Sequence, residues 1–507
     1  MREKKQKRSL IIASAVFVLL LIAYVAVVLP MMKDDTVTEP PELVEGEVLG
    51  TNNRIMMFPQ VTRAEMKEIF VSNEHGEFTL VKDGENFKIK GFEDVSCKSE
   101  GISSLVVAAG YTITSKRLTA EATEAELEKY GLAERDVYWK VTCTDGREYR
   151  VFVGDKLVSE EGYYAMLEGR EDCVYILSTS VETSILQPAT AFVNPILCLG
   201  LTDQNYYLID DFTVMHGEDV FVLVKQSKKS EFVNPDAQAE TKMMYPAGYK
   251  TDDTYFMSNV ASKFVSMVGE EVVYMGEDKE ELEKYGLADP YYSVYFTYTN
   301  GSSELEYYFF VSEKQDDGCY YAVSNLYGFR IVVKCTADNF SWLENKLISW
   351  VDDYPIAINI LRVDSMNIET ADGKYDFDLS HGVTADEVAT LEIDGPDGFR
   401  LSDADVYNFR ELYKDFLAIQ IMGELEFTES EIDDVIAKDD SHMTTVTFNL
   451  TDGSVQEFKF YRYSTGRAIL SANDSKNFFV YDDWLLKIRT DVQKLLSHLE
   501  IDSHSKN

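Results

Sequence analysis

The octapeptide ELEKYGLA occurs at residues 126–133 and again at residues 281–288, and each copy is followed at the same distance by a turn, TDG at 144–146 and TNG at 299–301. Its glycine can take the left-handed conformation that ends a helix, and the leucine after it can pack back on the last turn. A ligand site used twice is the weaker alternative, because these side chains offer no general base, nucleophile or metal ligand. We predict a structural corner, which turns a helix into the first strand of a sheet, at Tyr130, Gly131 and Leu132 and at Tyr285, Gly286 and Leu287.

The similarity between the two copies continues beyond the octapeptides. Alternating apolar strands flank both turns, and they also flank a third turn, TDG at 451–453, whose copy lacks the Tyr-Gly-Leu element. Upstream of each copy, a hairpin precedes an amphipathic helix, for which Ser99, Asp252 and Ser402 are the expected N-caps.

Each copy also ends in a segment with helical spacing, which is clearest at 337–351. The predicted fold class is α+β: an N-terminal transmembrane helix is followed by three repeated modules, each a mostly antiparallel sheet with covering helices. We expect the modules at residues 66–195, 205–352 and, as a degenerate copy, 356–500.

The charge of the chain is strongly asymmetric. The whole sequence carries 88 acidic and 48 basic side chains and a formal charge of -40, yet it opens with the basic stretch MREKKQKR. Coulomb repulsion opposes binding of such an acidic body to polyanions. Nucleic acids and anionic lipid surfaces are therefore unsuitable partners for the bulk of the chain.

Residues Leu10–Leu29 carry no charged side chain, and about 20 apolar residues are what a helix needs to cross a bilayer. A cleaved signal peptide is the alternative, but its apolar region usually runs only about 7–15 residues and ends in a small-residue cleavage site. The basic tail is expected to stay in the cytoplasm. We therefore predict a single-pass protein of the bacterial cell membrane, with a tail and signal anchor at 1–30, an extracytoplasmic spacer at 31–65, and an extracytoplasmic body.

The six cysteines show no CxxC spacing, so neither a zinc site nor a thioredoxin-like motif is indicated. If residues 318–335 form a hairpin, Cys319 and Cys335 fall nearly opposite each other, where a disulfide can form outside the cytosol. Two packed thiols are the favoured alternative.

The run LEKYGLA, followed by a strand, an Asp-Gly or Asn-Gly turn and a Tyr-Tyr-Ala strand, resembles the bacterial family catalogued as domain of unknown function 4340 (DUF4340). The resemblance covers two clear copies and one degenerate copy. A further family hallmark, a glycine late in the next strand, is Gly154 in FVGDK and is replaced by Ser312 in FVSEK. This replacement puts the turn of the second module in doubt.

The resemblance implies a single-pass, surface-facing membrane protein that is often encoded beside an ABC transporter and is similar to auxiliary components of gliding-motility-type transporters. It implies no activity and no catalytic residues. The sequence itself has no GxGxxG, GxxxxGK[ST], GxSxG or HExxH motif, and its six histidines are scattered. We predict no catalytic, cofactor-binding or metal-binding residues.

The leading hypothesis is a non-catalytic extracytoplasmic accessory or scaffold protein of an ABC-type transporter complex, whose residues 10–29 contact the membrane and the permease. The alternative is a free-standing surface module that binds wall polymer or a secreted protein, with exposed tyrosines contacting protein or glycan. An extracytoplasmic hydrolase is a weaker third reading. It would need an acidic cleft between modules and a carboxyl group whose pKa is raised by burial.

Overall fold

The computed structural model describes residues 41–502, apart from residues 113, 115, 230–231, 233–236, 238, 301–302, 384–388 and 399. The predicted anchor helix and basic tail lie outside these residues. Within the described part of the chain, no helix is both long enough and apolar enough to cross a membrane.

The chain forms two compact units. The first runs to Glu93 and from Cys97 to Phe192, and the second takes residues 94–96 and everything from Val193 on. The first sheet lies in the first unit, and the second and third sheets share the second unit.

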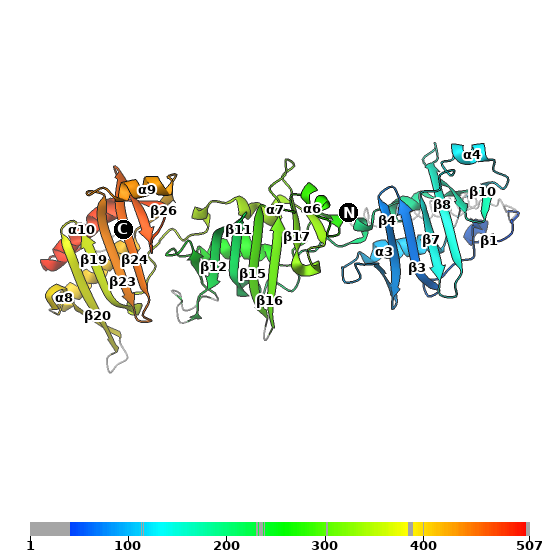
Figure 1. Cartoon of the computed structure of the whole chain (residues 1–507). Helices are drawn as coiled ribbons and strands as arrows, with labels where there is room; N and C mark the ends of the chain where they lie inside the picture. Colours follow the sequence, from blue (N-terminus) through cyan, green and yellow to red (C-terminus); the bar gives the residue numbers. More distant parts are fainter. Residues whose placement is uncertain are drawn as a thin grey trace, which may run out of the picture. The chain divides into compact units, whose positions relative to one another are not determined.

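Three eight-stranded antiparallel sheets make up most of the described chain (Figure 1). The first contains β3 (Met66–Asn73), β4 (Gly76–Asp83), β5 (Asn86–Ile89), β6 (Lys116–Thr119), β7 (Tyr138–Cys143), β8 (Glu148–Lys156), β9 (Tyr163–Leu167) and β10 (Arg170–Leu177). The second contains β11 (Ile209–His216), β12 (Asp219–Gln226), β13 (Thr241–Tyr245), β14 (Glu271–Met275), β15 (Tyr292–Asn300), β16 (Ser303–Val311), β17 (Tyr320–Ser324) and β18 (Ile331–Cys335). The third contains β19 (Val363–Thr370), β20 (Gly373–Val383), β21 (Ala389–Asp394), β22 (Ile421–Glu424), β23 (His442–Leu450), β24 (Val455–Ser464), β25 (Arg467–Ala472) and β26 (Ser475–Tyr481).

The strands lie in the same order in all three sheets. Numbered within each module, this order is third, second, first, fifth, sixth, seventh, eighth and fourth. The predicted α+β class with three repeated, antiparallel modules is therefore confirmed. The third and fourth strands were not predicted; the third pairs with the second at one edge, and the fourth pairs with the eighth at the other.

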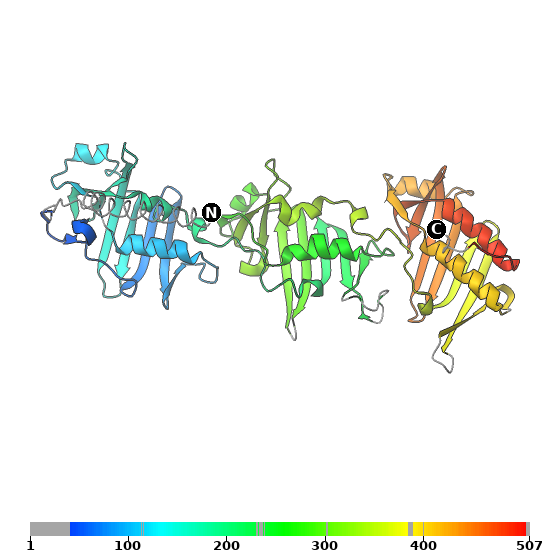
Figure 2. The ribbon, with the colours of Figure 1, turned by 180° about the vertical axis from the view of Figure 1, so that it is seen from behind.

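Helices cover one face of each sheet, as Figure 2 shows. They are α3 (Ser99–Gly110) in the first module, α5, η7 and η8 (Asp253–Tyr255, Phe256–Val260 and Ala261–Phe264) in the second, and α8 (Asp403–Leu417) and α10 (Asp483–Leu496) in the third. Asp252 and Ser402 are N-caps, as expected, and their side chains accept backbone N–H hydrogen bonds. The expectation for Ser99 was wrong, because Lys98 is the N-cap there and makes no side-chain capping bond.

The regular helix expected over 337–351 is broken into α7 (Ala337–Phe340), η10 (Ser341–Glu344) and η11 (Leu347–Ser349). A straight helix buries only one face, and residues 340 and 342 point in nearly opposite directions on it. Phe340 and Trp342 are both buried, and the Trp342 indole donates to the Asn339 carbonyl at 2.9 Å. Burying both rings therefore requires the break.

Residues 47–61, which we expected in the spacer, pack on the first sheet. β1 (Val48–Leu49) pairs with β2 (Ile55–Met56), and the buried ring of Phe58 stacks on Tyr149 with a centroid distance of 4.3 Å. The hydrophobic effect thus holds this segment to the module, so the folded body begins before residue 66.

A buried carboxylate also ties this segment to the sheet. The Glu47 side chain is fully buried, accepts a hydrogen bond from the Tyr175 hydroxyl at 2.8 Å and forms an ion pair with Arg117. Arg170 donates to the Tyr175 hydroxyl at 3.0 Å and also to the Met57 carbonyl. Because a buried charge is tolerated only when it is paired, this network fixes the position of the segment.

The first Tyr-Gly-Leu corner ends α4 (Glu124–Lys129). Gly131 has a φ of +66°, and the Leu132 N–H donates to the Leu127 carbonyl at 2.9 Å. The Gly131 N–H donates to the Glu128 carbonyl at 3.2 Å, which completes a Schellman cap. The second copy ends α6 (Lys279–Lys284) in the same way, with φ +68° at Gly286 and bonds of 3.0 Å from Leu287 to Leu282 and from Gly286 to Glu283.

The corner and α3 cover opposite faces of the first sheet. Trp139 donates to the Ala109 carbonyl of α3, so its side chain faces that helix. Phe152 pairs with the neighbouring Tyr138 and therefore points the other way, where it packs with Leu127 and Leu132. In the second module, Leu287 packs with Val323 and Val332 in the same manner.

Ser312 does not disturb the second corner. A Cβ at Gly154 would lie 2.1 Å from the Tyr130 carbonyl oxygen, so the first corner requires glycine there. Ser312 is fully buried, and its hydroxyl accepts from the Tyr321 N–H at 3.0 Å and donates to the Glu313 carbonyl at 2.7 Å. The buried hydroxyl of Ser312 thus has both a hydrogen-bond donor and an acceptor as partners.

A lysine clasp joins α8 to α10 in the third module. The Lys487 ammonium lies 2.6 Å from both Asp415 and Asp491, whose side chains are 0% and 1% exposed. Burial alone would raise the pKa of Asp491, but hydrogen bonds from Lys487 and Lys494 outweigh it and hold the pKa below its usual value. Because Lys487 neutralises both side chains, α8 and α10 can each bury a carboxylate where they meet.

We predict that Gly131→Ala is more destabilising than Gly286→Ala, although both glycines lie in the same octapeptide. Both substitutions cost roughly 1–2 kcal/mol because alanine disfavours positive φ. A Cβ at 131 would also lie 2.5 Å from Asp155 Oδ1, whereas the nearest atom at 286 is 3.5 Å away. Hydrogen exchange of the α4 and α6 amides in the full chain measures the difference. Equal losses of protection would contradict the packing argument.

We predict that Lys487→Met lowers the free energy of opening of α10 by roughly 2–4 kcal/mol at pH 7, because two buried carboxylates lose their shared cation. A depressed pKa gives stability that is present above the unfolded value of about 3.9 and is lost as the pH falls through the folded value. The difference in the free energy of opening of α10 between the native chain and the variant should therefore become smaller below about pH 4. Hydrogen exchange of α10 measures this, and Lys374→Met, which breaks an exposed pair with Glu369, is the control. A difference in opening free energy that does not depend on pH would contradict the prediction.

Candidate functional site

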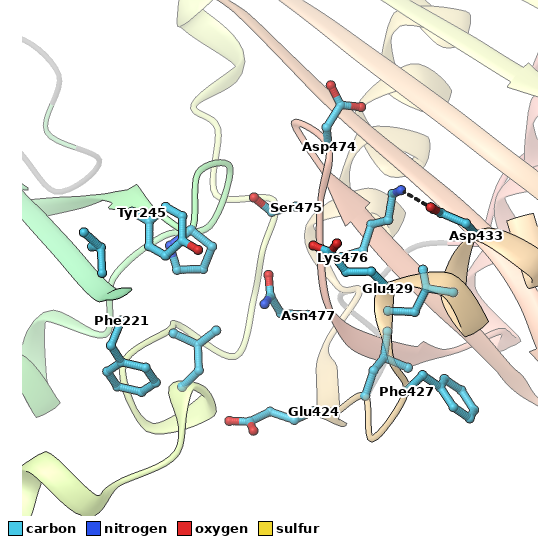
Figure 3. A pocket seen from close by; sticks show the side chains of 15 residues that line it. Phe221, Tyr245, Glu424, Phe427, Glu429, Asp433, Asp474, Ser475, Lys476 and Asn477 are labelled. Atoms are coloured by element: carbon cyan, nitrogen blue, oxygen red, sulfur yellow. Dashed lines mark hydrogen bonds and ion pairs between the residues drawn. The ribbon is translucent and has the colours of Figure 1, made fainter. Parts of the chain in front are cut away.

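A hollow of about 640 Å³ lies within the second unit, and both its second and third modules contribute side chains. We call it the acidic hollow. It is lined by Val220, Phe221, Tyr245, Pro246, Leu347, Glu424, Leu425, Phe427, Glu429, Ile432, Asp433, Asp474, Ser475, Lys476 and Asn477. In Figure 3, Phe221 and Tyr245 lie on one side, and Phe427, Asp433 and Lys476 lie on the other.

The wall from the second module is apolar. Phe221 comes from the start of β12, Tyr245 and Pro246 from the end of β13, and Leu347 from η11. Tyr245 is 50% exposed, so half of its surface is available for contact. This wall therefore offers contact area without charge.

The wall from the third module combines a hairpin turn with α9 (Glu429–Ile436). Asn473 and Asp474 join β25 to β26 with φ values of +44° and +71°, and Asn and Asp are among the few residues that accept this conformation. Thr428 caps α9 through a capping box with Glu431. Along the chain, α9 lies between the fourth and fifth strands of its module, as α4 and α6 do in theirs. Unlike them, it ends without a left-handed glycine.

The two walls are joined by hydrogen bonds. The buried Tyr249 hydroxyl donates to the Ser475 carbonyl at 2.9 Å and accepts from the Asn477 N–H at 3.1 Å. The Ile348 N–H donates to Glu424 Oε1 at 2.6 Å. Burial raises the pKa of Tyr249, which keeps its hydroxyl a donor in the physiological range.

The charge of the lining is negative. Four carboxylates and one ammonium group line the hollow: Glu424, Glu429, Asp433, Asp474 and Lys476. Lys476 pairs with Asp433 at 3.0 Å, and Glu424 holds the Ile348 N–H. Glu429 and Asp474 also line the hollow and are both exposed, so their charges are accessible to solvent.

The chemistry of this arrangement suits binding more than hydrolysis. Paired carboxylates act as acid and base only when they are free to exchange protons with a substrate. Asp433 and Glu424 are already engaged in the fold. Asp253, whose pKa is raised by burial, is not a lining residue and accepts two hydrogen bonds from Thr241.

The residues singled out from the sequence lie elsewhere. The two Tyr-Gly-Leu corners pack into separate apolar clusters on their own sheets. None of the six cysteines forms a disulfide, and Tyr320 rather than Cys319 pairs with Cys335 across the hairpin. The structure thus contains the packed-thiol alternative and not the disulfide. Among the described residues, no group of three or more His, Cys, Asp or Glu side chains could hold a metal ion.

Sequence reasoning missed the hollow because its lining comes from five separated segments. The nearest available signal was the Asn473–Asp474 turn, which marks a tight hairpin but not what lies beside it. Nothing in the segment around Tyr249 indicates a partner more than two hundred residues away.

We predict that Tyr249→Phe weakens the junction by roughly 1–2 kcal/mol, because it leaves the Asn477 N–H and the Ser475 carbonyl without their partner. Hydrogen exchange at Asn477 should become faster. Tyr245→Phe, which removes a hydroxyl from a half-exposed ring on the same hollow, is the control and should change nothing. Unchanged exchange at Asn477 in the Tyr249 variant would show that the bond contributes no stability.

The model of a protein family described as Domain of unknown function (DUF4340) matches residues 102–290. The match begins within α3 and ends just before β15, so it spans parts of the first two modules. The family match does not itself show a repeat; the evidence that the module is repeated is the shared strand order of the three sheets. No curated protein and no solved structure gives a significant match. The expected resemblance is confirmed: residues 102–290 of this chain match the DUF4340 family.

Proposed function

We propose that this chain is a single-pass, membrane-anchored, extracytoplasmic accessory protein of an ABC-type transporter complex, and that it acts as a non-catalytic scaffold. The observation that carries the proposal is the use of one strand order three times. A chain that repeats one stable module presents several surfaces of similar shape, which suits a scaffold. The apolar run Leu10–Leu29 supports the location, and the partner class is what the resemblance to DUF4340 implies.

The modules also leave surface available for contact. In the second sheet, alternate residues of β15 face the helices and are buried, such as Val294 and Phe296. Tyr295 lies between them on the opposite face and packs on Tyr308 with a centroid distance of 4.6 Å. Tyr308 is 37% exposed. Paired tyrosines of this kind give rigid, amphipathic contact area.

A second candidate function is a tethered binding module for wall polymer or a secreted protein. The acidic hollow favours it, because it combines exposed aromatic rings with exposed carboxylates. In this alternative the anchor is only a tether, and any spanning helix would serve. A hydrolase is the weakest candidate, since two of the four carboxylates of the hollow are already engaged.

We predict that crosslinking and mass spectrometry on native membranes capture an ABC permease with the intact chain. Replacing Leu10–Leu29 by an unrelated spanning helix should abolish this capture, because the proposed contact lies in the bilayer. The level of the chain in the membrane, measured by immunoblot, is the control for expression. Recovery of the same wall or secreted partners with either anchor, and of no permease, would support the tethered binding module instead.

A further inference from the structure

The acidic hollow has the features of a recognition site for one class of ligand. Its rim carries exposed carboxylates at Glu429 and Asp474, while Lys476 is already neutralised by Asp433. A concave surface lined by one sign of charge concentrates ligands of the opposite sign. The charge of the occupant should therefore be positive.

The apolar lining adds a second requirement. Large rings stand on both walls, Tyr245 at 50% and Phe427 at 40% exposure, and Pro246, Leu347 and Ile432 also line the hollow. Phe427 also packs edge-on against Tyr463 at 5.4 Å, which holds it in place. A small inorganic cation would leave this apolar surface exposed to water, so the occupant needs an apolar group of its own.

We propose that the acidic hollow binds a short segment of a partner protein in which a lysine or arginine neighbours an aromatic or branched apolar residue. The apolar side chain enters between Tyr245 and Phe427, and the cation lies toward Glu429 and Asp474. A volume of about 640 Å³ accommodates a segment of a few residues. The inference goes beyond the proposed function, because it stands whether or not the partner is a transporter.

A neutral glycan fits the hollow less well than such a peptide. Sugars also stack on aromatic rings, but their hydroxyls do not require net negative charge around them. The backbone carbonyl of Ser475 and N–H of Asn477, which could read a ligand's hydroxyls, are already bonded to Tyr249. Binding of a neutral sugar with no binding of the basic peptide would overturn the proposal.

The structure offers variants that change charge with little change of shape. Asp474→Asn keeps a residue that accepts the left-handed turn conformation, and Glu429→Gln keeps the length of an exposed side chain on α9. Asp434→Asn is the matched control, because it removes one charge from the same helix at an exposed position that does not line the hollow. Exchange protection at Asn477 reports whether each variant keeps the junction intact.

The test is binding of the fluorescent pentapeptide Ala-Arg-Trp-Lys-Ala to the full chain in nanodiscs, with Ala-Glu-Trp-Glu-Ala as the opposite-charge peptide. We expect saturable binding of the basic peptide only. The Asp474→Asn and Glu429→Gln double variant should weaken it about 2- to 20-fold, and Asp434→Asn should leave it unchanged. Tyr245→Ala should weaken binding of the basic peptide as well. This result would distinguish binding in the hollow from general attraction to an acidic surface.

Equal binding of both peptides, absence of binding at millimolar concentration, or equal weakening by Asp434→Asn would overturn the proposal. A photoreactive phenylalanine analogue placed at position 245 tests it in native membranes. The crosslinked partner peptide should carry Lys or Arg next to an aromatic or branched apolar residue, and an acidic peptide would contradict the proposal. Because neither experiment alters Leu10–Leu29, their outcome is independent of the anchor-exchange experiment.

Discussion

Each module depends on the antiparallel pairing of its first strand with its fifth, β3 with β7, β11 with β15 and β19 with β23. Without it, the upstream hairpin and the downstream strands would be two small sheets, each with an exposed edge and an uncovered apolar face. Pairing merges them, so that one layer of helices can cover the apolar side chains of both halves. In the first module Val71 of β3 and Val141 of β7 are buried together in this way.

The opposite face of the sheet is covered in one way in the first two modules and in another way in the third. In the first two, the Tyr-Gly-Leu corner folds a short helix back onto the later strands and buries leucines there. In the third, α9 occupies the same place in the chain without the glycine, buries Ile432 and contributes Glu429 and Asp433 to the acidic hollow. The copy that lost the shared sequence is thus the one whose helix lines the candidate site.

The excess of acidic residues shapes the structure in two ways. Buried carboxylates are paired with cations: Arg117 forms an ion pair with Glu47, and Lys487 forms ion pairs with both Asp415 and Asp491. This use is favourable because an unpaired buried charge costs far more than an exposed one. Other carboxylates remain on the surface, and at the acidic hollow they adjoin exposed rings.

Local chemistry was readable from the sequence. The alternating strands, the turns, the caps at Asp252 and Ser402 and the left-handed glycines 131 and 286 depend on neighbours within a few residues, so a short stretch determines them. Three outcomes depended on distant contacts and could not be read: the eight-stranded order, the breaking of the 337–351 helix around Trp342, and the docking of residues 47–61 through Glu47. The acidic hollow belongs with these. Its walls meet because Tyr249 bonds to β26, and only the tertiary structure brings together side chains that the sequence separates by more than two hundred residues.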